Sequence, residues 1–116
     1  MNILLVGKDL GLLDTRAEVL SSSWIVKRVL FENLSAGIFA GSYNLVVLCH
    51  SLTTLEAEVT AFGFRHFNPH VSILWLQQMP VESASIKKYE RLTIPIEPQL
   101  LKETVGRVAC SRYEPF

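Results

Sequence analysis

The sequence has no excess charge of either sign and no long apolar run. Eleven Lys and Arg residues balance eleven Asp and Glu residues, and the basic residues are scattered rather than gathered into a stripe. Nucleic-acid binding therefore has little electrostatic support. No apolar run approaches the roughly 20 residues that a membrane-spanning helix needs, and the apolar segment 1–6 is too short for a signal peptide. We expect a cytoplasmic protein that binds neither nucleic acid nor membrane.

Cysteines are scarce as well, since Cys49 and Cys110 are the only two. Both lie in ordinary apolar segments, a usage that fits a reducing compartment better than a disulfide framework, and we interpret both as free thiols. The chain has 116 residues, of which 49% are hydrophobic, so it can bury a core without disulfides or metal. It contains no internal repeat and no linker-like change in composition. We therefore predict one domain over residues 1–116.

Short apolar segments alternate with helical patterns along the chain. Four segments are rich in branched residues, and three of them are apolar nearly throughout, as buried parallel strands are. These segments are 2–6, 24–29, 44–49 and 71–76. A weaker segment at 91–94 ends at Pro95, whose ring and missing N–H terminate a hydrogen-bonded ladder. We predict an edge strand there.

Between these strands, apolar residues recur three or four apart, which makes one apolar helix face in each case. The three sets are Leu10, Leu13, Ala17 and Leu20; Leu55, Val59 and Phe62; and Leu101, Val105 and Val108. Asp9 is placed to cap the first helix. Thr53 and Glu56 match a capping box at the second, and Pro98 suits the first turn of the third. We predict helices at all three places.

Two further segments complete the pattern. A weaker helix is predicted at 34–40, whereas the short polar segment 79–88 predicts a stunted helix or a loop in place of a full fourth helix. Strands and helices that alternate in this way imply right-handed crossovers and a sheet covered on both faces. The sequence therefore predicts a doubly wound α/β sandwich with a five-stranded parallel sheet and a shortened or missing fourth helix.

Three stretches of this pattern are similar to those of one known family. Residues 2–9, NILLVGKD, look like a first strand and acidic turn; residues 43–49, YNLVVLC, look like a phosphoryl-acceptor strand; residues 92–98, LTIPIEP, look like a lysine-proline turn before a last helix. In this order the chain resembles, over nearly its whole length, the chemotaxis-regulator-like receiver domain of bacterial response regulators. The resemblance implies a flavodoxin-like sheet with ligands at the carboxyl ends of its strands, and a role in two-component signal transduction.

The residues that carry phosphorylation in that family are replaced in this chain. In the family, paired carboxylates after the first strand hold Mg²⁺, an aspartate accepts the phosphoryl group and a lysine steadies it. Here Gly7 and Lys8 occupy the paired-carboxylate positions, Cys49 the acceptor position and Ile94 the lysine position, which leaves Asp9 as the only nearby acid. Mg²⁺ prefers oxygen ligands, and the Lys8 ammonium would repel it. The resemblance thus implies a degenerate pseudo-receiver without phosphotransfer and without a cofactor.

The switch residues of the family are altered too. Gln77 falls where a serine or threonine senses the phosphate, and Arg91 falls where an aromatic residue rotates inward. We therefore expect a binding module rather than an enzyme. It would dock onto another signalling protein or onto a second copy of itself through segment 79–88, the last strand and the last helix, where Lys87, Lys88 and Tyr89 mix basic and aromatic groups.

A second interpretation stays open, in which the protein is a sensor or an unrecognised enzyme whose altered pocket binds an anion near Lys8 or responds to oxidants through Cys49. Against it, free cysteines are among the residues most often buried. Cys49 and its neighbour His50 also point to opposite faces of an extended strand. His66 and His70 have a metal-ligand spacing, but Pro69 lies between them and disfavours a continuous helix. We expect no metal site.

Overall fold

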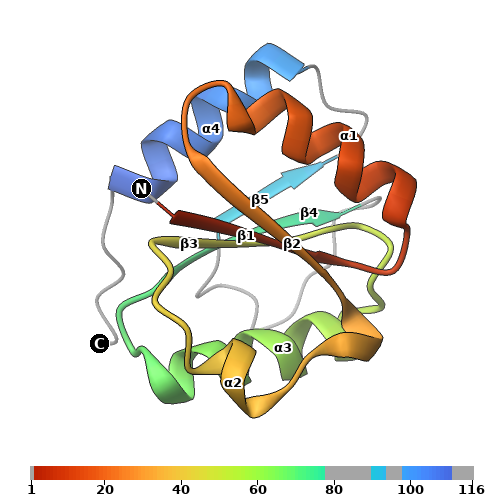
Figure 1. Cartoon of the computed structure of the whole chain (residues 1–116), viewed down its shortest axis with the longest axis vertical. Helices are drawn as coiled ribbons and strands as arrows, with labels where there is room; N and C mark the ends of the chain where they lie inside the picture. The colour runs from red at the N-terminus through yellow and green to blue at the C-terminus, as the bar shows by residue number, and fades with distance from the viewer. Residues whose placement is uncertain (1, 78–89, 94–97, 111–116) are drawn as a thin grey trace.

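The computed structural model describes the backbone of residues 2–77, 90–93 and 98–110, and the side chains of residues 2–76 and 98–108. A parallel sheet lies between two helical layers (Figure 1). Its strands lie in the order β2-β1-β3-β4-β5. They are β1 (Asn2–Gly7), β2 (Ile25–Leu30), β3 (Leu45–Leu48), β4 (Ser72–Gln77) and β5 (Glu90–Thr93). The doubly wound α/β prediction is confirmed, and β5 lies at an edge of the sheet as predicted.

The helices divide between the two faces of the sheet. In Figure 1, α1 (Leu10–Ser21) and α4 (Pro98–Cys110) lie above the sheet, and α2 (Ala36–Phe39) and α3 (Thr54–Phe67) lie below it. A short 3₁₀ turn, η1 (Phe31–Asn33), precedes α2, so the helix predicted over 34–40 is shorter than expected. Segment 79–88, for which the sequence predicts a stunted helix or a loop, falls outside the described residues. No helix in the described part of the chain is long and apolar enough to cross a membrane.

Alternate side chains of the central strands supply two separate cores, as the two-residue period of a strand requires. Ile3 and Leu5 of β1 pack toward α1 and α4, whereas Leu4 and Val6 pack toward α3. The predicted apolar faces of α1 and α4 are buried, except for the exposed Leu10. Their buried residues are Leu13, Ala17, Leu20, Leu101, Val105 and Val108.

The apolar set predicted for α3 does not face the sheet. Leu55, Val59 and Phe62 are 69%, 54% and 75% exposed. The side that packs on the sheet is the opposite one, formed by Ala57, Thr60, Ala61 and Phe64. Small residues let the helix approach the sheet closely, and Thr60 buries its hydroxyl by donating a 2.7 Å hydrogen bond to the Glu56 carbonyl oxygen. Because α3 has apolar residues on both sides, their spacing alone does not identify the buried one.

Candidate functional site

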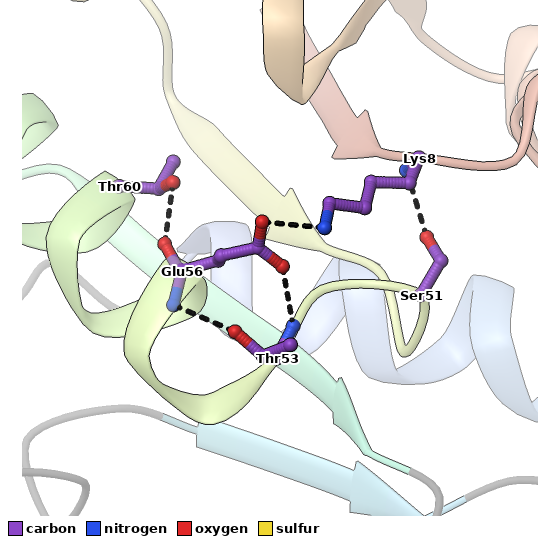
Figure 2. Close-up of polar contacts among 5 residues, drawn as sticks. All are labelled: Lys8, Ser51, Thr53, Glu56 and Thr60. Atoms are coloured by element: carbon purple, nitrogen blue, oxygen red, sulfur yellow. Dashed lines mark hydrogen bonds and ion pairs between the residues drawn. The ribbon is translucent and has the colours of Figure 1, made fainter.

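The predicted pocket lies where the loops that follow β1 and β3 meet. In the sheet, β1 lies between β2 and β3. The strand order reverses at β1, so the carboxyl ends of β1 and β3 form the topological switch point of the sheet. Gly7 ends β1, and Cys49 follows β3 directly. The backbone N–H of Lys8 donates to the Ser51 hydroxyl oxygen at 2.8 Å, which ties the two loops together (Figure 2). The structure therefore brings Gly7, Lys8 and Cys49 into one site.

Asp9, the nearby acid, has a structural role. It is the N-cap of α1, and its carboxylate accepts a hydrogen bond from the Leu12 N–H at 3.2 Å. The capping prediction is confirmed. This contact satisfies a helix N–H that otherwise lacks an intrahelical partner, and it directs the carboxylate toward α1.

The ammonium of Lys8 is neutralised within the chain. Its Nζ lies 2.5 Å from Oε2 of Glu56, at the start of α3. The other carboxylate oxygen of Glu56 accepts a hydrogen bond from the Thr53 N–H at 2.9 Å, and the Glu56 N–H donates to the Thr53 hydroxyl oxygen at 3.1 Å. The predicted capping box is thus confirmed, and its glutamate also pairs with Lys8 (Figure 2). The hydrogen bond from Lys8 is the main cause that lowers the pKa of Glu56, followed by the bond from the Thr53 backbone.

Gly7 is tightly packed on three sides. A Cβ built on it would lie 3.0 Å from the Ser51 Oγ, 3.2 Å from the Cys49 Cβ and 3.2 Å from a methyl carbon of Leu13. Ser51 Oγ is held by its bond to Lys8, and Cys49 and Leu13 belong to the buried core. A side chain at the first of the two carboxylate positions that the resemblance implies would therefore have to push these neighbours aside by a few tenths of an ångström.

Cys49 is a buried thiol, only 1% exposed. Burial raises the pKa of this thiol, and the nearby Arg16 guanidinium offsets part of that effect. Arg16 also lies with Nη2 at 3.1 Å from Nδ1 of His50. The pKa of His50 is lowered, first by burial and then by Arg16, while Asp9 acts in the opposite direction. The cation that acts on the Cys49 thiol is therefore Arg16.

An open hollow of about 250 Å³ adjoins the site, lined by Lys8, Leu30, Phe31 and Glu32. It is smaller than the roughly 300–1,000 Å³ of ordinary ligand pockets. The Lys8 Nζ lies 5.8 Å from the centre of the Phe31 ring, within cation–π range. In the described part of the chain, no group of three or more His, Cys, Asp and Glu residues could hold a metal ion.

The remaining predicted residues are placed only in part. Gln77 ends β4 opposite Thr93, and Arg91 lies in β5 opposite Trp75, but their side chains are not described. The predictions for Ile94, Lys87, Lys88 and Tyr89 fall outside the described residues. Sequence reasoning missed two contributions, the hydroxyl of Ser51 and the guanidinium of Arg16. It did find Glu56 as a helix cap, but a local capping pattern gives no sign of an ion pair with a lysine far away in the chain.

Parallel strands in the order β2-β1-β3-β4-β5, with helices on both faces, form a flavodoxin-like fold. CheY4, a chemotaxis protein of Vibrio cholerae, matches this chain with a TM-score of 0.78 and 15% identity over 92% of this chain and 97% of its own. The Thermotoga maritima response regulator TrrA, in complex with Mg²⁺–BeF, has a TM-score of 0.78 and 20% identity over 92% and 97%. A receiver domain protein of Methanospirillum hungatei has a TM-score of 0.77 and 18% identity over 94% and 93%.

No protein-family model matches the sequence, and no curated protein matches it. The similarity to receiver domains therefore shows the fold, and the predicted flavodoxin-like α/β class is confirmed. Function has to be argued from the site, because one fold supports many functions.

Exchange of Glu56 for glutamine is expected to lower stability at neutral pH but not in acid. Glutamine keeps the capping box but removes the charge that pairs with Lys8. The folded-state pKa of Glu56 lies below its ordinary 4.5, so the ion pair stabilises the fold above that value and is lost as the pH falls through the folded-state pKa. Urea unfolding midpoints of both proteins should differ at neutral pH and converge in acid. If the two midpoints differed by the same amount at every pH, the effect of Glu56→Gln would not be electrostatic. Lys8→Met, which removes the same ion pair, is the matched control.

Proposed function

We propose that this chain is a receiver-fold binding module of signal transduction that is not phosphorylated. The observation that carries the proposal is the Lys8–Glu56 ion pair at the carboxyl end of β1. By the resemblance, Lys8 stands where the family has the second of its paired carboxylates. An ammonium and its own counter-ion thus occupy the place where receiver domains gather negative charge for Mg²⁺.

Gly7 supports the same proposal by its packing. The family's first carboxylate would have to enter a space that Ser51, Cys49 and Leu13 pack tightly. A carboxylate at this position would therefore have to displace neighbouring groups as well as replace a hydrogen atom. The Thermotoga maritima relative was solved in complex with Mg²⁺–BeF. This chain has neither of the paired carboxylates that the family uses to bind Mg²⁺.

Cys49 at the acceptor position adds a third argument. Phosphoryl transfer needs an ionised or activated nucleophile, and the thiolate is the nucleophilic form of cysteine. Burial raises the pKa of the Cys49 thiol, so the thiol is protonated at neutral pH. The described residues include no group of three or more His, Cys, Asp and Glu residues that could hold a metal against the phosphoryl oxygens, and the raised pKa of Cys49 leaves no ionised acceptor. Such a domain acts through its surfaces, on another signalling protein or a second copy of itself.

The proposal predicts that the native protein gains no phosphoryl group from acetyl phosphate and Mg²⁺. Intact-mass measurement after incubation checks this, with an active receiver domain treated in parallel as the control. Cys49→Asp alone should also stay unlabelled, because positioning and electrostatics supply most of this catalysis and both supports would still be lacking. A stoichiometric gain of one phosphoryl group by the native protein would refute the proposal.

The alternative of a redox or anion sensor has less support. Oxidant sensing needs an accessible, low-pKa thiol, and Cys49 is buried with a raised pKa. Anion binding at Lys8 competes with its pairing to Glu56. If an anion does bind in this region, Arg16 is the better cation. Its buried Nη1 has no hydrogen-bond partner among the described residues.

A further inference from the structure

Arg16 of α1 and His50, in the loop after β3, form a hydrogen bond between two elements that are far apart in the sequence. Nη2 of Arg16 lies 3.1 Å from Nδ1 of His50, and both side chains are partly buried. A guanidinium has five N–H donors and no acceptor, so Nδ1 of the imidazole accepts this bond and carries no proton. The neutral ring of His50 therefore holds its proton on Nε2.

A second proton on His50 is incompatible with this contact. An imidazolium has a donor on each ring nitrogen, so its Nδ1–H would point at the Arg16 N–H and two positive charges would adjoin. In the described part of the chain, the charged groups that act on His50 are Arg16 and Asp9. Lys8 and Glu56, which lie on neighbouring segments, neutralise each other. Protonation of His50 therefore has to separate it from Arg16.

Of the two partners, Arg16 is the one that moves away. The backbone at His50 is held on both sides, because the Cys49 N–H donates to the Val6 carbonyl oxygen at 2.9 Å and the Leu52 N–H donates to the Cys49 carbonyl oxygen at 3.1 Å. Arg16 has a long, flexible side chain, and its buried Nη1 has no hydrogen-bond partner among the described residues. An unpaired buried donor is unfavourable, so the guanidinium gains hydrogen bonds to water when it turns outward.

We propose that the Arg16–His50 contact is a pH-sensitive latch between α1 and the loop after β3. The neutral ring holds the guanidinium beside Cys49, and the protonated ring releases it. Asp9, the N-cap of α1, supplies the counter-charge for the imidazolium after Arg16 has left. The latch is independent of the proposed function, since neither partner belongs to the Lys8–Glu56 ion pair on which that function rests.

The latch opens on the acid side of pH 6.5. Burial and then Arg16 lower the pKa of His50 from its ordinary 6.5, and Asp9 offsets part of this effect. Because the folded protein disfavours the proton, the neutral ring stabilises the fold fully above pH 6.5. This contribution is lost as the pH falls from 6.5 through the folded-state pKa of His50.

Nuclear magnetic resonance of the native protein tests the latch directly. At neutral pH the ring of His50 should carry a proton on Nε2 and none on Nδ1, and the Arg16 side chain should be ordered. Below pH 6.5 the ring should titrate, and the Arg16 guanidinium should become mobile in step with it. A proton on Nδ1 at neutral pH, or an Arg16 side chain whose mobility does not change during the titration of His50, would overturn the proposal.

Substitution of Arg16 tests the same contact from the other side. Arg16→Met removes the donor and the charge, so the pKa of His50 should rise, and Arg16→Lys, which restores a cationic donor, should bring it back toward the native value. Arg28→Met is the matched control, because Arg28 is half-exposed and pairs with Asp14. It should leave the titration of His50 unchanged. If Arg16→Met did not raise the pKa of His50, or if Arg28→Met raised it equally, the latch would not exist.

Discussion

Gly7→Asp is expected to destabilise the fold by about 3 kcal/mol or more instead of opening a metal site, since overpacking a buried position costs roughly 1–3 kcal/mol and a buried carboxylate adds to that. Its Cβ alone would lie 3.0 Å from Ser51 Oγ and 3.2 Å from the Cys49 Cβ. Ser51 would have to give up its hydrogen bond to the Lys8 N–H to make room. Urea unfolding at neutral pH measures the change.

Gly11→Ala is the matched control for this substitution. Gly11 lies in the first turn of α1, and a Cβ there would meet only the Asp9 carboxylate at 3.4 Å, an ordinary contact. Alanine in that helical position is expected to stabilise the protein by about 0.5–1 kcal/mol. If Gly7→Asp were as stable as the native protein, the site would have more room than the packing shows, and the argument from its tight packing would fail.

The sequence predicted what depends on local rules. Apolar strands, the Asp9 cap, the Thr53 capping box and the end of α3 before Pro69 all follow from neighbouring residues, and the structure has each of them. The second helix was predicted too long. Gly37 and Gly41 weaken helix there, and only Ala36–Phe39 is helical, after the turn η1. Long-range contacts are different in kind, because no local pattern specifies them.

The site shows the same division. Resemblance placed Gly7, Lys8 and Cys49 together, and they lie together at the ends of β1 and β3. It gave no indication that Lys8 would pair with Glu56 or that Arg16 would lie beside Cys49 and His50. Glu56 and Arg16 come from helices on opposite faces of the sheet, and only the folded packing determines which side chains reach the strand ends. The chemistry at the site therefore had to be read from the structure.

The two phenylalanines of α3 provide the sharpest test of which side faces the sheet. Phe64→Ala is expected to cost about 3–5 kcal/mol, because truncating a buried aromatic residue leaves a cavity in the core. Phe64 is 2% exposed, and its ring centre lies 4.8 Å from that of Phe39 and 6.0 Å from that of Tyr43, so it holds α2 and the β3 entry against α3. Phe62→Ala, two residues away on the exposed face, should change the free energy of unfolding by no more than about 0.5 kcal/mol. Urea unfolding of both variants gives the comparison directly. Equal losses, or a larger loss for Phe62→Ala, would show that α3 presents the opposite face to the sheet.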